Sequence, residues 1–117
     1  MEQTMEIITE AIDLARLREM AGRRFGEMVK AVVDIERRIM AVDAELHADQ
    51  EALLLENGSA QRDLWGINLY PDVDGDDWIE FDSMINLRPA SGNRGRGVDD
   101  PVVRDRIRGI VTRLVLR

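Results

Sequence analysis

The chain of 117 residues contains no cysteine, a single lysine and few aromatic side chains. Without cysteine there is no disulfide framework, no thiolate metal site and no cysteine nucleophile. Aromatic residues make up 4% of the sequence, which is too few for a platform on which nucleic-acid bases stack. No apolar run approaches the ~20 residues that a membrane span needs, so we expect no membrane partner.

The composition is that of a folded protein with a hydrophobic core. Hydrophobic residues make up 44% of the chain and charged residues 33%. This length favours one compact α+β domain, residues 1–117. The first residues, Met-Glu-Gln-Thr, are acidic where a secretory signal would be basic, and we therefore expect a cytoplasmic protein.

The net charge of −7 is unevenly distributed along the chain. Residues from Arg88 onward include eight arginines and three aspartates, a net charge of +5, whereas the preceding residues carry −12. Fifteen of the sixteen basic residues are arginine, which binds planar anions through paired hydrogen bonds that lysine does not form. The acidic body argues against a nucleic-acid partner, because phosphate binding would require that charge to stay remote.

Alternation and spacing of apolar residues predict the first half of the fold. Residues 5–8 form a candidate edge strand, followed by a helix that Thr9 or Asp13 can cap. Residues 29–36 and 40–47 alternate in character and are predicted to pair as an antiparallel hairpin. We expect Asp49 to cap a short helix that ends at Gly58.

The second half is predicted to contain two more strands and a terminal helix. A strand over residues 65–70 leads through an Asp74-Gly75 turn into a strand over residues 78–88. Along that strand we expect a bulge or a buried hydroxyl bond at Ser83. The side chains expected to face inward are Ile79, Phe81, Ile85 and Leu87. Asp100 and Pro101 are a strong helix start.

The resulting order, β-α-β-β-α-β-β-α, predicts a single, mainly antiparallel sheet with helices packed on one face. The alternation would place polar side chains on the opposite face. Since neighbouring strands lie ~4.8 Å apart, several carboxylates would converge there. Such a face is either a solvated surface or an acid-base or cation site.

A catalytic interpretation of that face centres on His47, the only histidine. The candidate catalytic residues are His47, Glu45, Glu80 and Asp82. A metal site would need Asp49 as a further ligand, and Asp49 is better explained as a helix cap, so we predict neither a metal nor another cofactor.

The loop after the last predicted strand reads RPASGNRGRG and is the other candidate site. Glycines let backbone amides approach a ligand, and arginines supply forked donors for a phosphate or carboxylate. The candidate anion- or partner-binding residues are Arg88, Asn93, Arg94 and Arg96. The loop is neither a Walker motif nor a dinucleotide fingerprint. Alternatively, these arginines pair with the acidic face of the sheet and fix the loop.

Four stretches, FGEMVKAVVDIE, AELHADQEALLLENGS, DLWGINLYP and IEFDSMINLRPASGNRGRGVDD, carry a family resemblance. Together they resemble a family of small uncharacterised prokaryotic proteins, a domain of unknown function, over most of the chain from about Phe25. The resemblance implies no catalytic residues.

Two functional hypotheses follow. The first is a small binding or interaction protein, a candidate homo-oligomer, that takes a small anionic ligand or a partner at the Arg/Gly-rich loop. The alternative is a hydrolase or phosphate-handling enzyme that uses the carboxylate-rich face, His47 and the loop on one substrate. This alternative requires the loop to fold back over that face.

Overall fold

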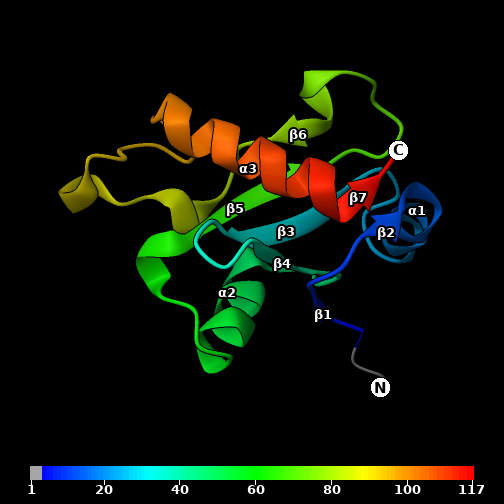
Figure 1. Cartoon of the computed structure of the whole chain (residues 1–117), viewed down its shortest axis with the longest axis horizontal. Helices are drawn as coiled ribbons and strands as arrows, with labels where there is room; N and C mark the ends of the chain where they lie inside the picture. The colour runs from blue at the N-terminus through cyan, green and yellow to red at the C-terminus, as the bar shows by residue number, and fades with distance from the viewer. Residues whose placement is uncertain (1–3) are drawn as a thin grey trace.

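A computed structural model describes residues 4–117, which form an α+β fold with a five-stranded sheet (Figure 1). The strand order is β1-β4-β3-β5-β6, and every neighbouring pair is antiparallel. The strands are β1 (Glu6–Ile8), β4 (Ile39–Val42), β3 (Val29–Asp34), β5 (Leu64–Leu69) and β6 (Ile79–Glu80). Two short strands, β2 (Ile12–Asp13) and β7 (Val115–Leu116), pair in parallel outside this sheet. The predicted fold class is confirmed.

The three α-helices within residues 4–117 begin close to their predicted starts. They are α1 (Leu14–Arg23), α2 (His47–Glu56) and α3 (Pro101–Leu114). Asp13 caps α1 and Asp100 caps α3, each accepting a backbone N–H bond at 2.9 Å. Helix α2 begins at His47 rather than after Asp49, which instead lies in the first helical turn, where its charge complements the helix dipole.

The helices divide between the two faces of the sheet. As expected, α1 and α3 share one face, where Leu17 and Ile107 pack in the same core cluster as Val33. Helix α2 differs from the expectation of a single helical layer, because Leu54 packs with Val32 in a second cluster on the opposite face. Strand β4 is buried at every position, so both faces of the sheet need cover. The face predicted to be polar is therefore covered by α2 over β3 and β4, whereas Glu80 at the β6 edge is exposed.

Strand β6 is much shorter than the predicted strand over residues 78–88. It ends at Glu80, and the chain then leaves the sheet through 3-10 turns at Met84–Asn86 and Pro89–Ser91. Ser83 is buried, as expected for a break in the strand, and its N–H donates to the carbonyl of Arg96 at 2.9 Å. Beyond Ser83, the prediction that Ile85 and Leu87 face inward, on the same side as Ile79, is wrong. Ile85 packs on the α2 face of the sheet, and Leu87 is 37% exposed.

None of the helices within residues 4–117 combines the length and the apolar character that crossing a membrane would require.

Candidate functional site

His47 lies in the first turn of α2 and is buried against β5. Its Nε2 atom is 2.8 Å from the carbonyl oxygen of Ile67, and the side chain is 8% exposed. Burial is the main cause that lowers the pKa of His47, and the bond to Ile67 acts in the opposite direction. Weaker effects of opposing sign come from Lys30, Asp82 and Arg96. The ring is thus a buried, hydrogen-bonded part of the contact between α2 and β5.

The carboxylates proposed to act with His47 have other partners. Glu45 is exposed and lies 3.8 Å from a guanidinium nitrogen of Arg24. Glu80 accepts hydrogen bonds from Asn68 at 2.8 Å and from the Tyr70 hydroxyl at 3.1 Å. Burial, together with the charge of Glu80, raises the pKa of Tyr70.

Asp82 is the predicted carboxylate that pairs with the loop. It accepts a hydrogen bond from Nε of Arg96 at 2.7 Å, so the loop does fold back toward this face. Residues 4–117 contain no group of three histidine, aspartate or glutamate side chains placed to hold a metal ion.

The loop arginines are largely engaged within the chain. Arg88 donates to the carbonyls of Arg62 and Leu64, and its guanidinium lies 4.3 Å from the ring centre of Trp65. Burial lowers the pKa of Arg88. Arg94 is exposed and forms neither a hydrogen bond nor an ion pair with any residue from 4 to 117.

Asn93 fixes the shape of the loop from inside. Its side-chain amide donates to the carbonyls of Asn86 at 2.7 Å and Gly97 at 2.8 Å. Its carbonyl oxygen accepts the N–H of Asp99 at 2.9 Å. With every polar atom of its buried amide bonded, Asn93 supports the loop and has no group directed at solvent.

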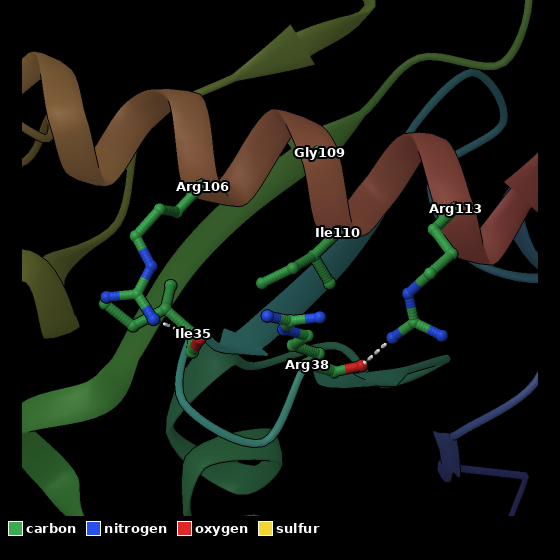
Figure 2. Close-up of a pocket in the computed structure, with 6 residues that line it drawn as sticks. All are labelled: Ile35, Arg38, Arg106, Gly109, Ile110 and Arg113. Atoms are coloured by element: carbon green, nitrogen blue, oxygen red, sulfur yellow. Dashed lines mark hydrogen bonds between the residues drawn. The ribbon is translucent and has the colours of Figure 1, made fainter.

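A different set of arginines surrounds a cavity on the α3 face. Arg38, Arg106 and Arg113 line a cavity of about 280 Å³ together with Ile35, Gly109 and Ile110 (Figure 2). Four of these residues come from α3 at positions i, i+3, i+4 and i+7, which lie on one side of a helix. The other two belong to the turn between β3 and β4. We call this cavity the arginine pocket.

The turn that supplies Arg38 is built by the buried carboxylate of Asp34. That carboxylate accepts the N–H groups of Glu36 and Arg37, each at 2.9 Å, and the hydroxyl of Ser59 at 2.6 Å. Arg38 then adopts a left-handed backbone conformation with φ of 58°, which is costly for a residue with a side chain. Its guanidinium lies between those of Arg106 and Arg113 (Figure 2).

Two backbone carbonyls hold the outer arginines in place. Nη2 of Arg106 donates to the carbonyl of Ile35 at 2.8 Å, and Nη2 of Arg113 donates to the carbonyl of Arg38. Within residues 4–117, the one carboxylate paired with any of these guanidiniums is that of Glu36, 3.8 Å from Arg106. Three positive charges thus face one cavity with a single, exposed negative partner.

The arginine pocket was not predicted from the sequence, where neither Arg38 nor Arg113 was a candidate site residue. They are 75 positions apart, and only the packing of α3 across β3 brings them together. The detectable signals were the excess of arginine in the last quarter of the chain and the helical spacing of Arg106 and Arg113.

A second cavity, of about 590 Å³, lies between the start of the described chain and α1. Its arginines are already neutralised: Arg16 pairs with Glu6, and Arg23 pairs with Asp43 at 2.5 Å. The arginine pocket is therefore the better anion site.

Comparison with known proteins gives a family and no function. Searches of curated proteins and of solved structures find no match. A family model described as "Protein of unknown function (DUF5674)" matches residues 6–114, which confirms the resemblance to a domain of unknown function. The chain belongs to the DUF5674 family.

Proposed function

We propose that this protein binds a small oxyanion in the arginine pocket. The observation that carries the proposal is the convergence of Arg38, Arg106 and Arg113 on one cavity, where Glu36 is their only paired carboxylate among residues 4–117. Like charges held together repel one another, and a bound anion relieves that repulsion. The guanidinium fork also matches the geometry of phosphate and carboxylate oxygens.

The pocket is organised before any ligand arrives. Arg106 and Arg113 each donate one N–H of the guanidinium to a backbone carbonyl, and the other N–H groups can donate to a ligand. Side chains already ordered in this way lose less conformational entropy on binding. The same bonds join α3 to the β3–β4 turn, so an anion that contacts Arg38 and either helical arginine would strengthen this junction.

Binding is better supported than hydrolysis. The arginine pocket is lined by arginine, isoleucine and glycine, which provide neither a nucleophile nor a general base. His47 lies in the first turn of α2, on the opposite face of the sheet, where its Nε2 is bonded to the carbonyl oxygen of Ile67. The sheet therefore separates the arginine pocket from His47, and one substrate could not contact both.

Interaction with a protein partner or a second copy is a further part of the proposal. Strands β1 and β6 form the two edges of the main sheet, and open edges can pair with another chain. The exposed side chain of Arg94 lies in the segment that follows β6, one of these two edge strands. Light scattering at high concentration tests the homo-oligomer, and a monomer would remove that part of the proposal.

Thermal unfolding in different anions tests the pocket itself. With a dissociation constant of about 1 mM, phosphate or sulfate at about 10 mM would stabilise the fold by about 1.4 kcal/mol over chloride at equal ionic strength. Such a gain raises the melting temperature by roughly 4–8 °C in a domain near this size. Equal melting temperatures in phosphate, sulfate and chloride would refute the proposal.

Two variants locate the effect. Arg38→Gly removes one guanidinium and suits the positive φ. Gly109→Glu places a carboxylate four residues before Arg113, where it can pair within the helix and occupy the pocket. Both should abolish the gain in phosphate while keeping the protein folded. Arg94→Ala removes an exposed arginine elsewhere and should keep the full gain.

A further inference from the structure

We infer that the ligand of the arginine pocket is a small organic phosphate monoester whose apolar group rests on Ile35 and Ile110. This inference rests on the proposed function and adds the chemical class of the ligand. It follows from the charge, the size and the lining of the pocket.

The charge of the pocket matches a dianion. Three guanidiniums and the carboxylate of Glu36 leave a local charge of +2. A phosphate monoester carries about −1.5 to −2 near neutral pH and presents three acceptor oxygens. One oxygen can therefore face each of Arg38, Arg106 and Arg113. A planar carboxylate carries a single charge and has only two oxygens, so it would leave one guanidinium unmatched.

The size of the pocket exceeds that of an inorganic ion. Its volume of about 280 Å³ is close to the lower limit of ligand pockets, ~300 Å³, and far above the ~30 Å³ of one water molecule. Phosphate alone would fill only part of this space. The remainder can accommodate an organic group such as a single small ring or a short chain.

The lining shows where that organic part would lie. Ile110 points into the pocket between Arg106 and Arg113, and Ile35 lies at the foot of the pocket beside the carbonyl that holds Arg106 (Figure 2). Both isoleucines are almost fully buried, so they form the floor and the arginines form the rim. Because the two isoleucines keep little exposed surface, the gain would come mainly from the ligand. An apolar group placed on this floor would bury its own surface away from water, which a polar group would not do as favourably.

Gly109 keeps one side of the pocket open. A Cβ atom at this position would meet no other atom within 4 Å, so the glycine borders solvent rather than a packed neighbour. The phosphate can reach the exposed guanidiniums from this side, and the ester group can follow onto the isoleucine floor.

Calorimetric titration of the full chain with four compounds tests the inference. Phenyl phosphate should bind about tenfold more tightly than inorganic phosphate and than glycerol phosphate, whose body is polar. It should also bind at least tenfold more tightly than benzoate, which has the same ring with a carboxylate. Arg38→Gly should abolish binding of phenyl phosphate, and Arg94→Ala should leave it unchanged.

The outcomes separate this inference from the function on which it rests. Equal affinities for the three phosphates would overturn the apolar floor and leave oxyanion binding standing. Benzoate binding as tightly as phenyl phosphate would overturn the preference for a phosphate. Failure of all four compounds to bind would overturn both proposals. Binding of phenyl phosphate that persists in Arg38→Gly would place the site elsewhere and overturn the inference.

Discussion

The side chain of Asn86 pairs with both backbone polar groups of Gly66. Its Oδ1 accepts the N–H of Gly66 at 2.8 Å, and its Nδ2 donates to the carbonyl of Gly66 at 3.0 Å. These are the two bonds that a residue of a neighbouring antiparallel strand would exchange with β5. The Asn86 amide thus completes the edge of β5 beyond the point where β6 has ended. It also donates to the carbonyl of Arg96 at 2.9 Å, which ties the loop to the sheet.

Replacing Gly66 with alanine should severely destabilise the protein. A Cβ atom at this position would lie 2.5 Å from Cβ and Oγ of Ser83 and 3.1 Å from Cγ1 of Ile85. Relieving these clashes requires the covering segment to move and weakens the Asn86 bonds. We expect Gly66→Ala to lower the free energy of unfolding by about 3 kcal/mol, measured by urea denaturation.

Gly109→Ala is the matched control for this substitution. Gly109 lies inside α3 with open space around its Cβ position, so the same change should raise the free energy of unfolding by about 0.5–1 kcal/mol. The double variant G66A/S83G removes one clashing Cβ and should recover part of the loss. A Gly66→Ala protein as stable as the wild type would show that the covering segment does not press on β5.

The contact between Gly66 and Asn86 also explains which parts of the fold the sequence could predict. Local signals predicted the cap at Asp100 and the β3–β4 pairing correctly and gave Asp13 as one of two candidate caps for α1, because each depends on residues close in sequence. The strand over residues 78–88 was wrong beyond Glu80. The alternation of apolar and polar residues continues past Glu80 in the sequence. In the structure, however, the side-chain amide of Asn86 takes the place of a paired strand beside Gly66, 20 positions away.

The candidate site was less predictable for the same reason. The guanidiniums of Arg38 and Arg113 are brought together by the packing of α3 on the sheet, which no local pattern encodes. Arg96, by contrast, pairs with Asp82 on the face where an arginine–carboxylate contact was anticipated. That contact joins two residues only 14 positions apart, within the stretch whose charge pattern suggested it.

The two non-glycine residues with positive φ among residues 4–117 should respond in opposite ways to substitution by glycine. Arg38 has φ of 58° and Asp43 has φ of 65°, and glycine would remove the backbone strain at both. Arg38 also repels the neighbouring arginines, so Arg38→Gly should raise the free energy of unfolding by about 1 kcal/mol. The change can be measured by urea denaturation in chloride buffer.

Asp43→Gly should instead be destabilising. The Asp43 side chain is 1% exposed, and it accepts hydrogen bonds from Arg23 at 2.5 Å and Arg24 at 3.1 Å. Removing it leaves both guanidiniums without this partner, a loss of about 3 kcal/mol or more that the relief of strain cannot offset. If Arg38→Gly proved as destabilising as Asp43→Gly, the side chain of Arg38 would have a structural contact that outweighs the strain and repulsion.

Asn93→Asp should open the Arg/Gly-rich loop. The amide of Asn93 donates to the carbonyls of Asn86 and Gly97, and a carboxylate in its place would have no proton to give and would face carbonyl oxygens. We expect a loss of about 2–4 kcal/mol in the free energy of unfolding. Hydrogen exchange should show faster exchange of the Asp99 amide. Arg94→Asp, an acidic substitution at an exposed position of the same loop, should leave both measurements nearly unchanged.

Because of His47, the free energy of unfolding should decrease as the pH is lowered below about 6.5. Its pKa is lowered in the folded state, mainly by burial, whereas the unfolded chain keeps the ordinary value of ~6.5. Above ~6.5 the ring is neutral in both states, and the full stability is present. As the pH falls from ~6.5 toward the folded-state pKa, the unfolded state takes up a proton that the folded state does not, and the free energy of unfolding decreases. His47 is the only histidine, so no other imidazole titrates in this range.

The urea midpoint at pH values of about 7.5 and about 5.5 measures this effect. His47→Gln keeps an N–H that can donate to the carbonyl of Ile67 but has no group that titrates. The wild type should therefore lose more stability than His47→Gln over this interval, even if the variant is less stable at pH 7.5. An equal loss in both proteins would mean that the ring gains its proton as easily in the folded state as in the unfolded chain. His47 would then be more accessible to solvent than its contact with β5 and its bond to Ile67 indicate.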